Sequence, residues 1–184
     1  MSAYDLVLFV HVAGAAGLFL TVGTWMFGIA ALSRASRVEE VRTLTELVFL
    51  SDRALRIAGA LLVPAGAYMW LTTWGPSAAW VAVSIPSVVA AGILGGLVIE
   101  PRLKAAARLA TSSPDGPLPA QLRQALEDRA LTAGVRIEVG LMFGIVFLMI
   151  TKPDVALGVV AVALFSVLGL ASATPLRRAA PSHG

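Results

Sequence analysis

Five long stretches of this chain carry little or no charge, and this feature constrains its fold more than any other. Residues 6–32 contain no Asp, Glu, Lys or Arg, and similar apolar stretches cover residues 57–74, 78–99, 134–150 and 155–173. Crossing a bilayer takes roughly 20 residues of apolar helix. Only 14% of the residues are charged, against about a quarter in a usual soluble domain. We therefore predict an all-α, polytopic membrane bundle of five transmembrane helices, forming a single membrane domain over residues 1–184.

The positions of Lys and Arg predict how this bundle lies in the membrane. All but one of the 14 Lys and Arg fall within residues 33–56 and 100–133, at Arg136, or after the last apolar stretch at Arg177 and Arg178; the exception is Lys152. Cytoplasmic segments of membrane proteins carry such an excess. We therefore expect residues 33–56 and 100–133 to be cytoplasmic loops, with the N-terminus outside and the C-terminus in the cytoplasm. The expected location is the inner (plasma) membrane of a bacterium.

Some of the connecting segments also carry helix signals. A helix from about Val38 is expected to run into the second span. In residues 120–131, Leu122, Leu126 and Leu131 recur at near-helical spacing, which predicts an amphipathic helix on the membrane surface or leading into the fourth span. Asp154 is placed to cap the N-terminus of the last span.

Small residues recur at four-residue spacing in three of the apolar stretches. The sets are Ala13, Gly17 and Thr21; Gly92 and Gly96; and Gly140 and Gly144. Such residues let helix backbones approach closely in a bilayer. They indicate packing within the bundle, with a dimerisation face or a cavity for a flat cofactor as the functional alternative.

Several charged residues from distant parts of the chain fall near one membrane boundary: Arg53, Arg56, Glu100, Arg136 and Glu138. Buried charges need partners or water. The pairs Glu100–Arg56 and Glu138–Arg53 would supply partners and make this a structural charge cluster. The functional alternatives are a proton entry path, or arginines that hold carboxylates such as haem propionates.

His11 is the one histidine within an apolar stretch, since the other is His183 near the C-terminus. It lies about five residues inside the first span, roughly 7–8 Å from the outer boundary at 1.5 Å per residue. Met69 and Met149 reach the same depth. An imidazole with thioether sulfurs suits haem iron or copper, and Gly14 would leave room for a flat ring. The expected cofactor ligands are therefore His11, Met69 and Met149, with His11 as the metal ligand.

Two other roles of His11 remain open. It could form a hydrogen bond to Tyr68, Ser84 or a backbone carbonyl, or it could relay protons, because ionisable groups inside membranes are functional suspects. A haem held by two histidines would require a dimer, since the spans contain only this one.

Several function classes are excluded by what the chain lacks. It contains no cysteine, so it can form no disulfide, thiolate metal site or iron–sulfur cluster. No nucleophile–base pair, phosphate-binding loop or carboxylate dyad points to an independent hydrolase or ATPase. The small net charge of +3, without aromatic residues interleaved on a basic face, indicates no nucleic-acid partner.

The segment "HVAGAAGLFLTVG" at residues 11–23 resembles the opening of small bacterial membrane proteins related to the copper-resistance protein D and HemJ-like group. With "ITKPD" at residues 150–154, the pattern looks most like an uncharacterised family of integral membrane proteins next to that group. The resemblance implies a helical bundle whose first-span histidine, His11, binds haem b or lies on a copper path.

Two classes of function follow. The first is an integral membrane protein that binds haem b or copper and takes part in membrane redox chemistry. The second is a non-catalytic membrane subunit or small permease whose polar residues only hold the bundle together. The expected partners are the lipid bilayer and either a second copy of the chain or another membrane subunit.

Overall fold

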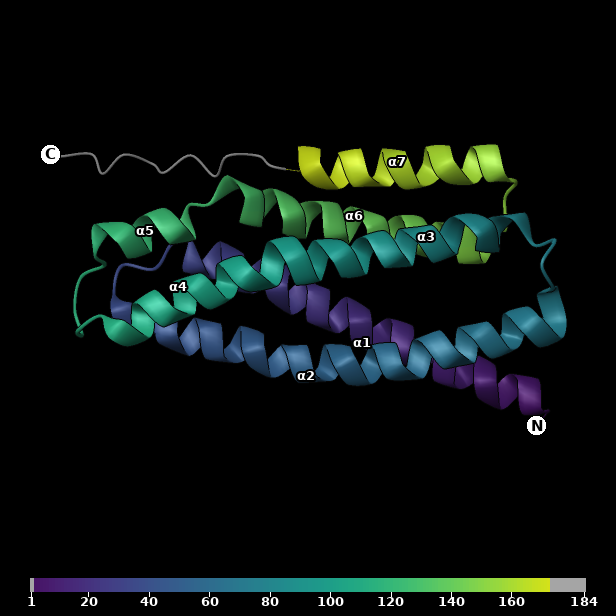
Figure 1. Ribbon diagram of the computed structural model, residues 1–184, viewed down its shortest axis with the longest axis horizontal. Coiled ribbons are helices and arrows are strands. Elements are labelled where there is room, and N and C mark those ends of the chain that lie inside the picture. Colours follow the sequence, from purple (N-terminus) through teal and green to yellow (C-terminus); the bar gives the residue numbers. More distant parts are fainter. Residues whose placement is uncertain (1, 173–184) are drawn as a thin grey trace, which may run out of the picture.

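The computed structural model, which describes residues 2–172, is a bundle of long helices lying side by side (Figure 1). The helices are α1 (Ala3–Leu32), α2 (Val38–Met69), α3 (Ala79–Leu94), α4 (Glu100–Ser112), α5 (Ala120–Leu126), α6 (Arg129–Thr151) and α7 (Val155–Ala171). Two π-helical turns, η1 (Trp70–Trp74) and η2 (Gly95–Ile99), extend α2 and join α3 to α4. The all-α fold class is confirmed. Residue 173, where the last apolar stretch ends, and Arg177, Arg178 and His183 lie outside the described residues.

Four of the helical segments are long and apolar enough to cross a membrane: residues 3–32, 38–74, 79–112 and 120–151. The fifth, α7, has 17 residues, near the lower limit for a span. The helix expected from Val38 is confirmed, because α2 begins there. Residues 33–56 and 100–133 are, however, mostly helical, in α2, α4 and α5, where the sequence analysis expected loops.

The helices that contain these segments are longer than a bilayer requires. The continuous helix of 37 residues from α2 to η1 is about 55 Å long at 1.5 Å per residue, against a hydrocarbon core of about 30 Å. It is therefore longer than the hydrocarbon core is thick. The end of the bundle where α1 turns into α2 and where α4 and α5 lie is called the charged end here; the opposite one, near residue 2, is the N-terminal end (Figure 1).

The two ends are packed differently. The main cluster of fully buried apolar residues lies toward the charged end and includes Leu32, Val38, Ile99, Leu103 and Leu122. Closer to the middle and the N-terminal end, large apolar side chains point outward: Leu20, Leu71 and Ile150 are each more than 70% exposed. Exposed apolar side chains of this kind suit contact with lipid, whereas the charged end has the packed core of a water-soluble domain.

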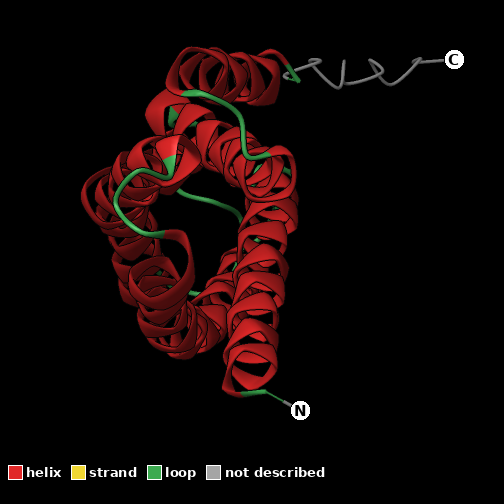
Figure 2. Ribbon diagram, turned by 90° about the vertical axis from the view of Figure 1, so that its right-hand side faces the viewer, coloured by secondary structure: helices red, strands yellow, loops and turns green. Residues whose placement is uncertain are grey.

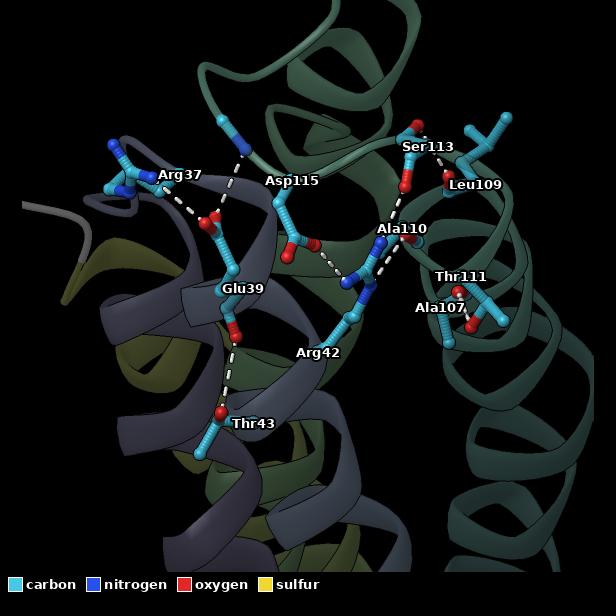
Figure 3. A network of polar contacts seen from close by, with 11 residues as sticks. Arg37, Glu39, Arg42, Thr43, Ala107, Leu109, Ala110, Thr111, Ser113 and Asp115 are labelled. Atoms are coloured by element: carbon cyan, nitrogen blue, oxygen red, sulfur yellow. Dashed lines mark hydrogen bonds and ion pairs between the residues drawn. The ribbon is translucent and has the colours of Figure 1, made fainter.

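Arg42 of α2 ties the charged end together (Figure 3). Its guanidinium donates to the Ala110 and Ser113 carbonyl oxygens and pairs with Asp115, over distances of 2.5 to 2.9 Å. The last carbonyls of a helix have no partner within the helix, so Arg42 satisfies groups at the end of α4. The following chain is held by Gly116, whose N–H donates to Glu39 and whose carbonyl accepts from the Val38 N–H.

The other turns follow their sequence signals. The carboxylate of Asp154 accepts from the Leu157 N–H at 2.8 Å, which confirms the expected cap of α7. The side chain of Asp128 caps α6 in the same way, just after α5. The helix expected from residues 120–131 is therefore confirmed in part: Leu122 and Leu126 lie in α5, whereas Leu131 lies in α6, after a break.

Small residues allow two of the helix pairs to pack closely. A Cβ atom on Gly17 would come within 2.9 Å of Ala58 on α2, and one on Gly144 would come within 3.1 Å of Val162 on α7. A side chain at either position would therefore push its helices apart. By contrast, Gly92 of α3 and Gly96 of η2 have open space where a Cβ would stand.

Seen along its axis, the bundle is a ring of helices with α7 on the outside (Figure 2). Helix α1 packs along α2 and also contacts α6, while α6 packs against α3 and α7. Helices α1, α2, α3 and α6 thus surround the centre of the bundle.

Candidate functional site

A cavity of about 410 Å³ lies between α1, α2, α3 and α6. Its volume is in the range of small-molecule sites, roughly 300–1,000 Å³. Apolar side chains make up most of its wall, among them Leu18 and Phe19 of α1 and Met142 and Ile145 of α6. Polar and charged residues lie at its two ends: His11 toward the N-terminal end, and Asp52, Arg56, Glu100 and Glu138 toward the charged end.

The cavity is bordered on one side by α2 and α3, which do not pack closely against each other. Val63 of α2 and Gly92 of α3 line the cavity and are themselves exposed, and Gly59 and Gly92 have no atoms where a Cβ would stand. In a bilayer, an opening on this side faces lipid chains rather than water.

His11 is held at its end of the cavity by α2. The imidazole Nδ1 lies 3.0 Å from the Leu62 carbonyl oxygen. A carbonyl oxygen can only accept, so Nδ1 carries the proton, and in the neutral ring Nε2 then carries the lone pair. Gly66 leaves room for the same edge of the ring, since a Cβ there would come within 2.9 Å of Cε1 of His11. Within residues 2–172, Nε2 has no hydrogen-bond partner.

The other two partners considered for His11 form no hydrogen bond with it among the described residues. The Ser84 hydroxyl donates to the Trp80 carbonyl oxygen at 2.8 Å, and Tyr68 is 45% exposed. Of the three hydrogen-bonded alternatives, the one to a backbone carbonyl is formed.

Gly14 does not leave the open space that the sequence analysis expected. A Cβ on Gly14 would come within 2.9 Å of both the Ala58 carbonyl oxygen and Cβ of Leu62. Helix α2 therefore fills the space beside Gly14, and this glycine serves close packing of α1 on α2. The glycines that widen the cavity are instead Gly59 and Gly92.

The two methionines expected near His11 differ in position. Met149 of α6 lines the cavity together with His11, whereas Met69 is buried and does not line it. Within the described residues, no three His, Cys, Asp or Glu side chains are grouped so that they could hold a metal ion. Among the described residues, the soft or borderline metal donors that share this cavity are therefore His11, Met149 and, in addition, Met142.

At the charged end, the expected ion pairs are not formed. Glu100 pairs with Lys104 at 2.5 Å rather than with Arg56, and none of the ion pairs among residues 2–172 joins Glu138 to Arg53. Arg56, Glu100 and Glu138 do share the cavity, whereas Arg53 and Arg136 do not line it. The cluster is thus brought together in part, without the expected pairing.

Glu138 has the least compensated charge of this group. Its side chain is 7% exposed, and its Oε2 atom has no hydrogen-bond partner in the described part of the chain. An unpaired buried carboxylate is costly, and ionisable groups in membrane helices mark functional pathways. Glu138 is therefore the residue of the charged end that most needs a ligand.

Two cavity residues were not found by the sequence analysis. Asp52 accepts a hydrogen bond from the Trp25 indole N–H at 3.1 Å, and both residues line the cavity. The available signal was an aspartate among arginines at the membrane boundary, with a tryptophan at the matching depth of the first span.

The fold and this cavity define a helical integral membrane protein with an internal, largely apolar site. The chain belongs to the family described as "Predicted integral membrane protein (DUF2269)", whose model matches residues 5–153. The expected uncharacterised membrane family is thus confirmed. Comparisons with curated proteins and with solved structures gave no significant match. The relation to the copper-resistance protein D and HemJ-like group stays a prediction.

Proposed function

We propose that this protein binds a small, mostly apolar molecule that reaches its cavity from the bilayer. The observation that carries the proposal is the cavity itself: one continuous space with an apolar wall and polar groups at both ends. Binding sites for small molecules commonly combine a large apolar surface with a few polar groups that orient the ligand. An amphiphile with a polar group at one or both ends fits this arrangement.

The opening between α2 and α3 supports entry from the membrane. A molecule dissolved among lipid chains could pass Val63 and Gly92 without leaving an apolar environment. The function is therefore binding, and either delivery or transport, of a membrane-dissolved compound. A transport function of this kind would correspond to the small permease, which is part of the second class of function expected from the sequence.

The test is to fill the cavity and to measure which molecules the purified protein retains. Gly92→Phe places a large side chain in the cavity, while Gly96→Phe changes a glycine one turn away that also has open space but does not line the cavity. Native mass spectrometry should detect a bound small molecule on the wild type and on Gly96→Phe, and lose it on Gly92→Phe. Equal retention by all three proteins, or none by the wild type, would contradict the proposal.

Haem b or copper is a second candidate ligand, favoured by the bond between His11 and Leu62. A histidine that binds metal through one ring nitrogen usually donates a hydrogen bond from the N–H of the other to a carbonyl or carboxylate. The Nδ1–H of His11 makes such a bond to the Leu62 carbonyl oxygen. His11 and Met149 both line the cavity, and the His11 Nε2 atom and the Met149 sulfur would be the groups that hold a haem iron. When bound, the iron would supply one-electron redox chemistry. The charged end fits haem less well, because Arg56 shares that end of the cavity with three carboxylates, whereas two propionates would need cations.

The visible spectrum of protein purified from haem-supplied cells tests this second candidate. His11→Gln and Met149→Leu should each abolish or shift a Soret band. Met69→Leu is the matched control, since Met69 is buried outside the cavity. Copper content, measured on copper-supplied protein by elemental analysis, tests the metal in the same variants. Wild-type protein that is colourless and free of copper under these conditions would rule out both ligands.

We also propose an orientation and a location for the bundle. The excess of Lys and Arg at the charged end supports placing that end in the cytoplasm, with five spans and the N-terminus outside. The membrane would be the inner (plasma) membrane of a bacterial cell. A second copy of the chain or another membrane subunit would meet the bundle through its exposed helix faces.

A further inference from the structure

We propose that the cavity is selective for an amphiphile with a cationic head, and that Glu138 binds this head as its counter-ion. The inference rests on the proposed function, because it names the chemical class of the molecule that occupies the same cavity. The ligand would be a lipophilic amine or a related organic cation, with its apolar chain directed toward His11.

The charges that line the cavity are mostly negative. Asp52, Glu100 and Glu138 are carboxylates, and Arg56 is the one Lys or Arg on the cavity wall. A low-dielectric wall around like charges strengthens their common potential. The charged end of the cavity therefore favours a positive group and disfavours an anionic head.

Two of these carboxylates already have partners. Glu100 pairs with Lys104 at 2.5 Å. Asp52 accepts from the Trp25 indole at 3.1 Å, and Arg56 lies one helical turn along α2 from it.

Glu138 has no such partner, although it is the most deeply buried of the three. Its side chain is 7% exposed, its Oε2 atom has no hydrogen-bond partner among residues 2–172, and it faces the cavity. Placing the head of the ligand there gives a partner to the one carboxylate of the cavity that has none among the described residues.

An ammonium group suits this position for two physical reasons. It carries the charge that the carboxylate lacks, and it offers up to three N–H donors, enough for Glu138 and a neighbouring acceptor. The rest of the wall, from Met142 to Phe19, is apolar, and it would cover an alkyl or aromatic body. A neutral alcohol with the same chain would fill the wall and could donate one hydrogen bond to Glu138, but it would leave the charge of the carboxylate uncompensated.

The experiment compares dodecylamine with dodecanol, which has the same chain and no charge. Saturable binding of each radiolabelled compound is measured on protein in nanodiscs, with empty nanodiscs subtracted to remove partition into lipid. Both compounds can donate a hydrogen bond to the Glu138 carboxylate, but only the ammonium adds the attraction of opposite charges. Wild-type protein should therefore bind dodecylamine about tenfold more tightly, the equivalent of about 1.4 kcal/mol. Glu138→Gln should remove this preference and keep dodecanol binding. Glu127→Gln, at an exposed site outside the cavity, should change neither.

The outcomes separate this inference from the proposed function. Equal affinity of the wild type for both compounds, or an unchanged preference in Glu138→Gln, would overturn the cationic selectivity while the cavity still binds. Absence of saturable binding of either compound to the wild type would overturn the proposed function, and the selectivity with it. The preference of the wild type does not depend on how any variant folds, and retained dodecanol binding shows that Glu138→Gln is folded.

Discussion

The contact of α1 with α2 at Gly14 gives the sharpest prediction of stability. A Cβ there would stand 2.9 Å from Cβ of Leu62 and 2.9 Å from the Ala58 carbonyl oxygen. Carbon atoms in good contact are about 3.5–4.0 Å apart, so Gly14→Ala would force the helices apart by roughly 0.6–1 Å. A gap of this size loses about a quarter to a half of each local dispersion contact. Such overpacking typically costs about 1–3 kcal/mol.

Gly23→Ala is the matched control, because Gly23 lies on the same helix with no atoms within 4 Å of its added Cβ. Alanine is the better helix former by about 0.5–1 kcal/mol in water, so this change should be neutral or mildly stabilising. The assay is unfolding in mixed detergent micelles, followed by tryptophan fluorescence. Gly14→Ala should lower the free energy of unfolding by about 1–3 kcal/mol relative to Gly23→Ala. Equal stability of the two variants would refute the close packing of α1 on α2 at this point.

Three further predictions concern other parts of the bundle. His11→Leu should lower the free energy of unfolding by about 0.5–1.5 kcal/mol through loss of one hydrogen bond, and His11→Gln should retain more of it; equal losses in the same micelle assay would show that the bond contributes nothing. Arg42→Ala should speed proteolysis after α4 much more than Asp115→Ala, since the Asp115 side chain is 68% exposed and an exposed pair is worth only about 0–1 kcal/mol; similar digestion of both variants would contradict this. A topology reporter fused after Ser112 should report the cytoplasm and one inserted at Pro76 the outside, whereas the same side for both would refute the arrangement of spans.

Hydropathy alone predicted that the apolar stretches form long helices, because apolar blocks near the length of a bilayer leave few alternatives to a helix. It did not predict that the helix continues through Glu100–Ser112, since this segment is more polar. The signal was present in Leu103, Ala106 and Ala110, which recur on one face and are fully buried at the charged end.

The sequence predicts how far along its helix a candidate site residue lies, but not toward which side of the helix that residue points. Met69 and Met149 were expected at the level of His11, yet only Met149 lines the cavity with it, because a residue's direction around the helix depends on how the helices pack. Gly14 shows the same limit of prediction. A small residue leaves space beside its helix, and the sequence does not say whether a neighbouring helix or a ligand fills that space. The ion pair of Glu100 was missed for a related reason. Glu100 pairs with Lys104 on its own helix, and not with Arg56 on α2 as expected.

Photolabelling tests the central claim, that the cavity is a binding site, most directly. A dodecylamine that carries a diazirine on its chain is irradiated with wild-type protein in nanodiscs, and the labelled residues are located by peptide mass spectrometry. The account predicts labels on cavity residues such as Phe19, Met142 and Ile145, which decrease when excess unlabelled dodecylamine is added. Labels confined to outward-facing residues such as Leu20 and Ile150, unchanged by the competitor, would contradict it.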